Sequence, residues 1–443
     1  MKIIKGSEFD SYWKKESKHK DDSKTEKTVK KIITAVQKEG DTAVRRFASK
    51  FDKSSPNRLE VPFSKLKTAY DELRSSDPAL TEALEFAAGN IYRFSLKQKE
   101  QFKDFEFEIQ SGLFTGQHII PVQRAAIYIP GGRFPLFSSV LMCMIPAFCS
   151  GVEEVILSSP PGKNGLPDNK ILAAAAIAAA ASGIPENRLR IFAMGGAQAI
   201  AALAFGTKSV PRVDVIAGPG NKYVAAAKRL LYGQVGIDFI AGPSDILIIA
   251  DGSECEGFAA AEYVAADMIA QAEHDPDARA RALVPNSEFA QQISSAIEKQ
   301  LLCLSTAQTA RASFKNGGLI IIYQNKEEAI RITNTIAPEH LELQVNGAES
   351  WIPSLRNYGS LFIGALCAEV LGDYSAGVNH TLPTSGSSCF TGGLSVRHFL
   401  KTVTTLRCTQ GTGFDQAAKA AQVLAKAEGL DGHAFSAAIR TKS

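Results

Sequence analysis

Short apolar runs closed by glycine turns recur in the chain from residue 125, and a segment of helical character follows each run. Strand, turn and helix in this repeated order predict βαβ crossovers, which build a parallel sheet with helices on its faces. An α/β fold is therefore expected. The first block of expected elements comprises strands at 125–129, 154–157, 190–194 and 213–217, and helices at 139–150, 171–181 and 223–231.

A second alternating block indicates another α/β unit. The expected elements are strands at 245–250, 319–323 and 361–363 and a helix at 258–273. Apolar residues at helical spacing predict that the region before about residue 116 is mainly helical. The segment after about residue 395 is expected to be a helical tail with an amphipathic stretch at 414–428.

Length and charge narrow the class of protein. The chain has 443 residues, more than one ordinary core holds, so two or more domains are expected. A net charge of only +3 argues against nucleic acid as a partner. The most apolar run, 171–181, is too short to span a membrane. With no apolar leader and no Cys-x-x-Cys among seven cysteines, a cytoplasmic protein without a thiolate zinc site is expected.

Three glycine turns stand at the ends of expected strands: Gly131-Gly132, Gly195-Gly196 and Gly218-Pro219-Gly220. Backbone N–H groups in such turns, with the helix N-terminus that follows, can bind phosphate. None has the Gly-x-Gly-x-x-Gly spacing, and each alone is explained by a tight turn that needs a positive φ. A dinucleotide crevice and simple turns therefore remain alternatives.

Two short motifs place a histidine beside a possible ligand or acid. Gln271 and His274 lie three apart at the end of an expected helix, so both side chains point to one face. They can ligate a cation or form a surface hydrogen-bonding pair. Glu339 and His340 follow Pro338, and proline with an acid is typical of a first helical turn. The same pair is suited to proton transfer near neutral pH.

The remaining candidates lie nearer the C-terminus. Glu369, Asp373 and His380 fall in a polar, glycine-rich segment that predicts a loop. An acid and an imidazole there can bind metal or substrate, or hold the loop by hydrogen bonds. Glu428 and His433 flank Gly429 at the end of the tail helix, and this glycine is typical of a helix C-cap.

Taken in order, these segments resemble the successive signatures of the histidinol dehydrogenase family. The resemblance runs from the end of the N-terminal region almost to the last residue. Its segments are Tyr-Ile-Pro-Gly-Gly at 128–132, Gly-Pro-Gly-Asn at 218–221, Ala-Gly-Pro-Ser at 241–244, Gln-Ala-Glu-His at 271–274, Ala-Pro-Glu-His at 337–340, 372–384, and Glu-Gly-Leu-Asp-Gly-His at 428–433.

The resemblance implies a role for each candidate. His340 matches the catalytic base, and Glu339 matches the residue that activates water. The residues that match the Zn²⁺ ligands, with one ion per subunit, are Gln271, His274, Asp373 and His433. Those that match substrate contacts are Ser244, Gln271, His274, His340, Glu369, Asp373, His380, Glu428 and His433. Those that match NAD contacts are Tyr128, Gln198 and Asn221.

The resemblance also implies NAD-dependent oxidation of L-histidinol to L-histidine through L-histidinal, in histidine biosynthesis. The implied fold is two incomplete Rossmann-like domains with helical N- and C-terminal arms, in an intertwined homodimer with a shared active site. We accordingly expect an N-terminal arm and part of the first α/β domain in 1–124 and the Rossmann-like NAD-binding domain in 125–240. The remainder of the first domain, with the catalytic and zinc residues, is expected in 241–394, and the helical tail in 395–443.

Two other interpretations stay open. Arg133 in the glycine turn and the Thr-Gly-Gly-Leu segment at 391–394 resemble relatives that oxidise other small alcohols, including sulfonated diols. Arg133 could meet an anionic group there, or lie at the surface. Glu369 instead favours a cationic or imidazole-bearing substrate. A catalytically inactive α/β binding protein is the third interpretation, and the intact acid–base and ligand residues argue against it.

Overall fold

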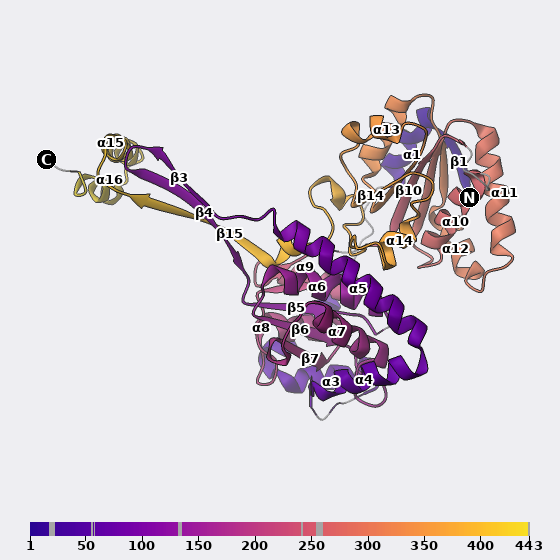
Figure 1. Ribbon diagram of the computed structural model, residues 1–443, viewed down its shortest axis with the longest axis horizontal. Helices are drawn as coiled ribbons and strands as arrows, with labels where there is room; N and C mark the ends of the chain where they lie inside the picture. Colours follow the sequence, from indigo (N-terminus) through magenta and orange to yellow (C-terminus); the bar gives the residue numbers. More distant parts are fainter. Residues whose placement is uncertain are drawn as a thin grey trace.

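The computed structural model describes residues 1–16, 23–54, 56, 58–131, 135–240, 242–253 and 260–441. The chain forms two α/β bodies, each built on a six-stranded sheet, and a long arm that projects from them and carries the C-terminus (Figure 1). The α/β class predicted from the strand, turn and helix pattern is confirmed.

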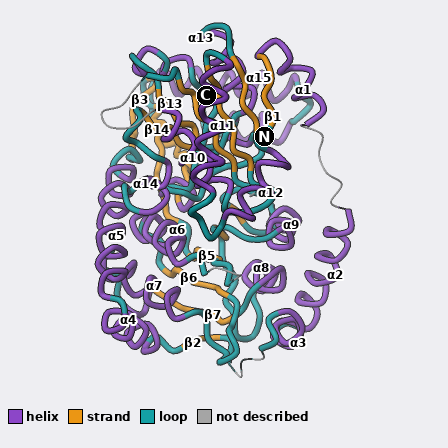
Figure 2. Tube along the Cα trace, turned by 90° about the vertical axis from the view of Figure 1, so that its right-hand side faces the viewer, coloured by secondary structure: helices purple, strands orange, loops and turns teal. Residues whose placement is uncertain are grey.

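The first body has the strand order β2-β7-β6-β5-β8-β9, and all neighbours are parallel except β2, which runs antiparallel to β7. Helices α4 to α7 pack on one face, and α2, α3, α8 and α9 on the other (Figure 2). The strands are Glu60–Val61 (β2), Arg124–Tyr128 (β5), Glu154–Ser159 (β6), Leu189–Ala193 (β7), Val215–Ala217 (β8) and Gly236–Ile237 (β9). The helices are Ser23–Glu39 (α2), Asp41–Phe51 (α3), Ser64–Ser76 (α4), Pro78–Lys99 (α5), Phe137–Ser150 (α6), Asn169–Ala181 (α7), Gly196–Phe205 (α8) and Lys222–Leu231 (α9).

The second body has the fully parallel order β1-β12-β11-β10-β13-β14. Helices α10 to α12 pack on one face, and α1 and α13 on the other. The strands are Lys2–Lys5 (β1), Asp245–Ala250 (β10), Arg279–Val284 (β11), Leu319–Ile322 (β12), His340–Gln344 (β13) and Ser360–Ile363 (β14). The helices are Phe9–Glu16 (α1), Ala260–Ala272 (α10), Ser287–Leu301 (α11), Ala307–Gly317 (α12), Lys326–Ile336 (α13) and Glu369–Tyr374 (α14).

Short 3-10 helices occupy Gly6–Glu8, Glu186–Arg188, Ala348–Ser350, Ile352–Ser354, Ser387–Cys389 and Val396–Phe399. In the described part of the chain, none of the helices combines the length and the apolar character that crossing a membrane requires.

The arm is a three-stranded antiparallel sheet that ends in two packed helices (Figure 1). Its elements are Phe105–Gln110 (β3), Leu113–Pro121 (β4), Leu400–Cys408 (β15), Thr412–Ala427 (α15) and Asp431–Ala438 (α16). Phe105, Phe107 and Ile109 alternate along β3, and each is more than half exposed. Exposed apolar stripes of this kind are typical of surfaces that take part in protein–protein contacts.

Two segments expected to be helical are strands of this arm. The stretch 105–109 reads Phe-Glu-Phe-Glu-Ile, a period of two that fits a strand and not a helix. The tail expected to be helical from about residue 395 has only a short 3-10 helix at Val396–Phe399 before β15, which pairs with β4 over its whole length. The tail helices begin only at Thr412.

Two site motifs also differ from expectation. Ala337 ends α13 with a left-handed φ of 49°, and His340 then starts β13 in register with Ile246 of β10. Glu339 and His340 therefore do not begin a helix. Glu369 and Asp373, expected in a loop, lie in the helix α14. His340 is thus held in β13, and Glu369 and Asp373 in α14, whereas Glu339 lies in the bend just before β13.

Candidate active site

The candidate side chains meet at the amino edge of the second sheet. The helix of a βαβ unit runs back to the amino ends of the strands. Helix α10 therefore brings Gln271 to this edge, and His274 follows just beyond its end. His340 begins β13 at the same edge, and the last turn of α14 brings Asp373 beside it.

His340 is buried, and two carboxyl groups face its ring. Its Nε2 is 3.1 Å from Asp373 Oδ1, and its Nδ1 is 3.7 Å from Glu369 Oε2. His380 lies on the other side of Asp373, with its Nδ1 2.7 Å from the Asp373 backbone oxygen and its Nε2 2.8 Å from Ser139 Oγ. Because Ser139 belongs to α6 of the first body, the site lies between the two bodies.

Acidic side chains and histidines in this buried site shift one another's pKa values. Burial raises the pKa of Glu369 well above its ordinary value, and the Asp373 carboxylate adds to the rise. Burial lowers the pKa of His340, but Glu369 and Asp373 raise it by more, so that it stands well above the usual value. Burial raises the pKa of Asp373 in turn, but His340, His380 and His274 hold it below its ordinary value. Such an excess of carboxylates is stabilised by a cation.

Several buried polar atoms of the site have no hydrogen-bond partner among the described residues. They are Gln271 Oε1, His340 Nδ1, Glu369 Oε1 and Glu369 Oε2. Buried polar atoms are otherwise almost always bonded, so this group indicates a place for a ligand. Amide, imidazole and carboxylate donors fit zinc, although a glutamine ligand is unusual. Within the described residues of one chain, no three His, Cys, Asp or Glu side chains form a metal site, so a zinc set here needs a further ligand.

Glu339 is held by a reciprocal pair of hydrogen bonds. Its Oε2 accepts from the Asp245 backbone N–H at 3.0 Å, and Asp245 Oδ1 accepts from the Glu339 N–H at 2.9 Å. The buried Arg281 donates to Asp245 Oδ2 at 3.1 Å. Ser244, the residue before Asp245, is therefore close to this clamp. Burial raises the pKa of Glu339 to about 8, which lets its carboxyl gain or lose a proton near neutral pH.

The three expected NAD contacts line one pocket of about 490 Å³ at the carboxyl edge of the first sheet. Tyr128 ends β5, and its hydroxyl accepts a hydrogen bond from Gly196 N–H at 3.0 Å. Gln198, in the first turn of α8, is buried, and its Nε2 has no partner among the described residues. Asn221 caps α9 through Oδ1. Gly131 and Gly196 also line the pocket, as a dinucleotide crevice requires.

One wall of this pocket was missing from the sequence-based prediction. Thr28 and Ile32 of α2, with Phe51 and Asp52 at the end of α3, line it as well. These residues lie in ordinary helical segments roughly 75 to 100 positions before Tyr128, and no local pattern links them to the glycine turns. Their place depends on how α2 and α3 pack on the first sheet.

Glu428 and His433 are not brought to the other candidates within one chain. Glu428 ends α15 and His433 lies in α16, at the tip of the arm, whereas α14 lies on the second body (Figure 1). Gly429 follows the C-cap residue Glu428 with a left-handed φ of 75°, which fits the helix end predicted there. Arg133 lies outside the described residues.

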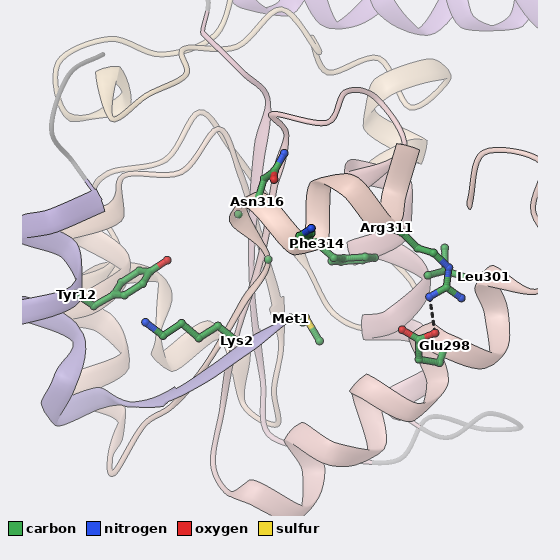
Figure 3. Close-up of a pocket in the computed structure, with 11 residues that line it drawn as sticks. Met1, Lys2, Tyr12, Glu298, Leu301, Arg311, Phe314 and Asn316 are labelled. Carbon is green, nitrogen blue, oxygen red and sulfur yellow. Dashed lines mark hydrogen bonds and ion pairs between the residues drawn. The ribbon is translucent and has the colours of Figure 1, made fainter. Parts of the chain in front are cut away.

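Another pocket, of about 510 Å³, opens at the amino ends of β1 and β12 (Figure 3). Arg311 on its wall is paired with Glu298 at 2.6 Å, and the Lys2 ammonium lies 4.4 Å from the centre of the Tyr12 ring. None of the candidate residues lines it. The pocket is therefore separate from the candidate active site.

Comparisons with known proteins agree with one another. The family model for histidinol dehydrogenase matches residues 15–441. The chain is 42% identical to histidinol dehydrogenase of Thermus thermophilus over 419 residues, 95% of each protein. It is 42% identical to that of Acinetobacter baylyi over 417 residues, 94% of this chain and 92% of the relative. The crystal structure of histidinol dehydrogenase from Elizabethkingia anophelis aligns with a TM-score of 0.89 at 33% identity, over 99% of this chain and 97% of that one.

Proposed function

This chain belongs to the histidinol dehydrogenase family, and on that basis we propose that it oxidises L-histidinol to L-histidine with NAD, through bound L-histidinal. The observation that carries the proposal is the pair of buried, unpartnered acceptors on Gln271 and Glu369, of which Glu369 Oε2 lies 3.7 Å from His340 Nδ1. A substrate with an ammonium group and an imidazole offers the donors that these acceptors lack.

Zinc is the proposed metal, held by Gln271, His274 and Asp373 of one chain and by His433 of another. When bound, zinc orients and polarises the substrate, since it is redox-inert. The donor set contains only nitrogen and oxygen, which agrees with the absence of a Cys-x-x-Cys motif in the sequence. The carboxylates around His340 also make a cation favourable at this position.

His340 and Glu339 divide the proton transfers in the proposed reaction. The neutral imidazole of His340 takes the proton of the substrate hydroxyl, a form that the positive charges of a bound metal and of the substrate ammonium would favour by offsetting the carboxylates that raise its pKa. NAD accepts the hydride in each of the two oxidations. Glu339, clamped by Asp245, takes a proton from the water that adds to the aldehyde between the two oxidations. The place of the site between the two bodies keeps the aldehyde away from bulk water.

NAD is proposed to occupy the pocket lined by Tyr128, Gln198 and Asn221. The order of the five parallel strands β7-β6-β5-β8-β9 supports an incomplete Rossmann-like domain. In such a sheet the crevice opens at the carboxyl ends of the strands where the order reverses, here between β5 and β8. Tyr128 ends β5 and Asn221 follows β8, on the two sides of that point.

A two-fold homodimer is proposed, in which the arm of one subunit covers the site of the other. Phe86 and Phe94 are exposed on α5, one turn to each side of Asn90. The Asn90 side chain bonds the backbone oxygen of Ser375, at the end of α14, so this apolar surface adjoins the site. The arm carries its own exposed apolar stripe, and covering one surface with the other would bring the partner's His433 to the metal.

A sulfonated diol is not favoured as substrate. The Asp373 carboxylate, whose pKa is held below its ordinary value, lies 3.1 Å from His340 Nε2 and would repel a sulfonate. Retention of the buried Glu369 instead suits a substrate ammonium group.

Stoichiometry tests the proposed reaction. Purified, zinc-loaded enzyme should form two NADH and one histidine for each L-histidinol consumed, as measured by absorbance and amino-acid analysis. The intermediate aldehyde should stay below detection with a trapping reagent. One NADH per turnover with free aldehyde in solution would contradict the proposal, as would turnover of anionic diols in preference to histidinol.

A further inference from the structure

Glu342 is a buried carboxyl group that the proposed chemistry does not use. It lies two positions after His340 on β13, so both side chains point to the same face of the sheet, toward α10. Gln344 lies two positions further on the same face. Leu341 and Leu343 point the other way, into the core formed with α13. Glu342 is only 1% exposed, so its oxygens need partners inside the protein.

One side of Glu342 faces a second buried acid, Asp267 of α10. Gln344 Nε2 donates to both, at 2.8 Å to Glu342 Oε2 and at 2.9 Å to Asp267 Oδ2. The two carboxyl groups therefore lie side by side around one amide nitrogen. Two buried carboxyl groups this close favour sharing one proton, because two negative charges would repel each other. Burial, together with the nearby charge of Asp267, raises the pKa of Glu342 well above its ordinary value.

The other oxygen of Glu342 holds the start of α14. Its Oε1 accepts from the backbone N–H of Glu369 at 2.8 Å. Glu369 is the first residue of α14, and the preceding Ala368 offers no side-chain cap. The side chain of Glu342, on β13, therefore caps the N-terminus of α14. The carboxyl of Glu369 has no hydrogen-bond partner among the described residues, so its position depends on the backbone that Glu342 holds.

We propose that Glu342, kept in place by Asp267 and Gln344, is a positioning residue that fixes the Glu369 carboxylate against His340 for the substrate. The inference rests on the proposed function, because it takes Glu369 as a substrate contact. It does not give Glu342 a role in the proton transfers. It predicts that substrate binding depends on the acceptor oxygen at position 342 more than on the ability of that side chain to ionise.

Three substitutions distinguish the effect of the acceptor oxygen of Glu342 from the effect of its acidity. Glu342→Gln keeps an acceptor for the Glu369 N–H and a donor for Asp267, and it loses only the bond from Gln344. Its KM for histidinol should stay within about threefold of wild type, since the lost bond is neutral. Glu342→Leu removes the acceptor and should raise this KM at least about tenfold, with a smaller change in kcat. Glu342→Asp keeps an acid but withdraws it from Glu369, and should behave like the leucine variant.

The KM for NAD should stay unchanged in all three variants, because the NAD pocket lies on the other sheet. Glu349→Leu, at an exposed position after β13, is the matched control and should leave both KM values unchanged. If the leucine variant does not fold, the KM values for histidinol of the Glu342→Gln and Glu342→Asp variants still test the inference. Asp near wild type with Gln impaired would overturn the inference, as would equal KM values in folded variants. Failure of the wild-type enzyme to oxidise histidinol would instead overturn the proposed function.

Discussion

Gln271 carries an amide oxygen that is buried in the last turn of α10 without a partner among the described residues. An unpaired buried acceptor costs about 1–3 kcal/mol. The unpaired oxygen, three residues before His274 in the chain, is explained if a metal ion binds there, because Gln271, His274 and Asp373 then offer the nitrogen and oxygen donors that zinc accepts. The exposure of His274 fits this interpretation, since a ligand shared with another subunit must lie at the open side of the site.

A loss of metal on substitution tests this argument. His274→Ala should lower zinc affinity by at least about tenfold, since one of few ligands is removed. Zinc retained after dialysis, measured by inductively coupled plasma mass spectrometry, should fall together with histidinol oxidation. His118→Ala is the matched control. His118 lies on β4, is half exposed, and has its Nδ1 2.8 Å from Asp104 Oδ2. Equal zinc in the two variants, or full activity of thoroughly chelated wild type, would contradict the assignment.

Helices and strands could be predicted from the sequence where neighbouring residues alone determine them. The strands from β5 to β8 and β10 are apolar runs buried on both faces and closed by glycine turns, and they were predicted to within a few residues. The start of β13 was not, because Pro338 and Glu339 look like a helix cap and only the register with β10 and β14 makes the segment a strand. The pocket wall made by α2 and α3 was also beyond local patterns, since distant packing places it.

The turn after β8 shows how one element depends on backbone conformation. Gly218 has a φ of 113°, and a Cβ there would lie 2.2 Å from the backbone oxygen of Tyr128. Gly218→Ala should therefore lower the free energy of unfolding by about 1–3 kcal/mol and raise the KM for NAD. Gly89→Ala, in the interior of α5 with open space around it, should raise stability by about 0.5–1 kcal/mol. Denaturant unfolding of both variants checks the opposite signs, and equal shifts would contradict the strain at Gly218.

The whole molecule repeats one topology. Numbered along the chain, strands β5 to β9 and strands β10 to β14 have the same spatial order, 3-2-1-4-5. Each sheet also gains an edge strand from the N-terminal region, β2 in one and β1 in the other. A duplicated unit would leave this shared order, which the sequence alone did not reveal. The functional residues nevertheless lie at different edges of the two sheets. The NAD pocket lies at the carboxyl edge of the first sheet, and His340 lies at the amino edge of the second.

The arm decides whether one chain can form a complete site. Within one chain, α16 with His433 lies at the tip of the arm and away from α14 (Figure 1). If the arm crosses to a partner, each active site combines His340 of one chain with His433 of the other chain. A subunit with His340→Ala and a subunit with His433→Ala, each inactive as a homodimer, would then form one intact site in a mixed dimer.

Random re-association makes about half of the dimers mixed, each with one working site of two, so about a quarter of wild-type activity should return. Activity is measured after subunit exchange, which two affinity tags on the two variants confirm. The matched control mixes His340→Ala with Asp373→Ala. These residues contact each other within one chain, so every mixed site keeps one defect and no activity should return. Recovery in the control, or none in the first mixture despite complete exchange, would contradict a site shared between subunits.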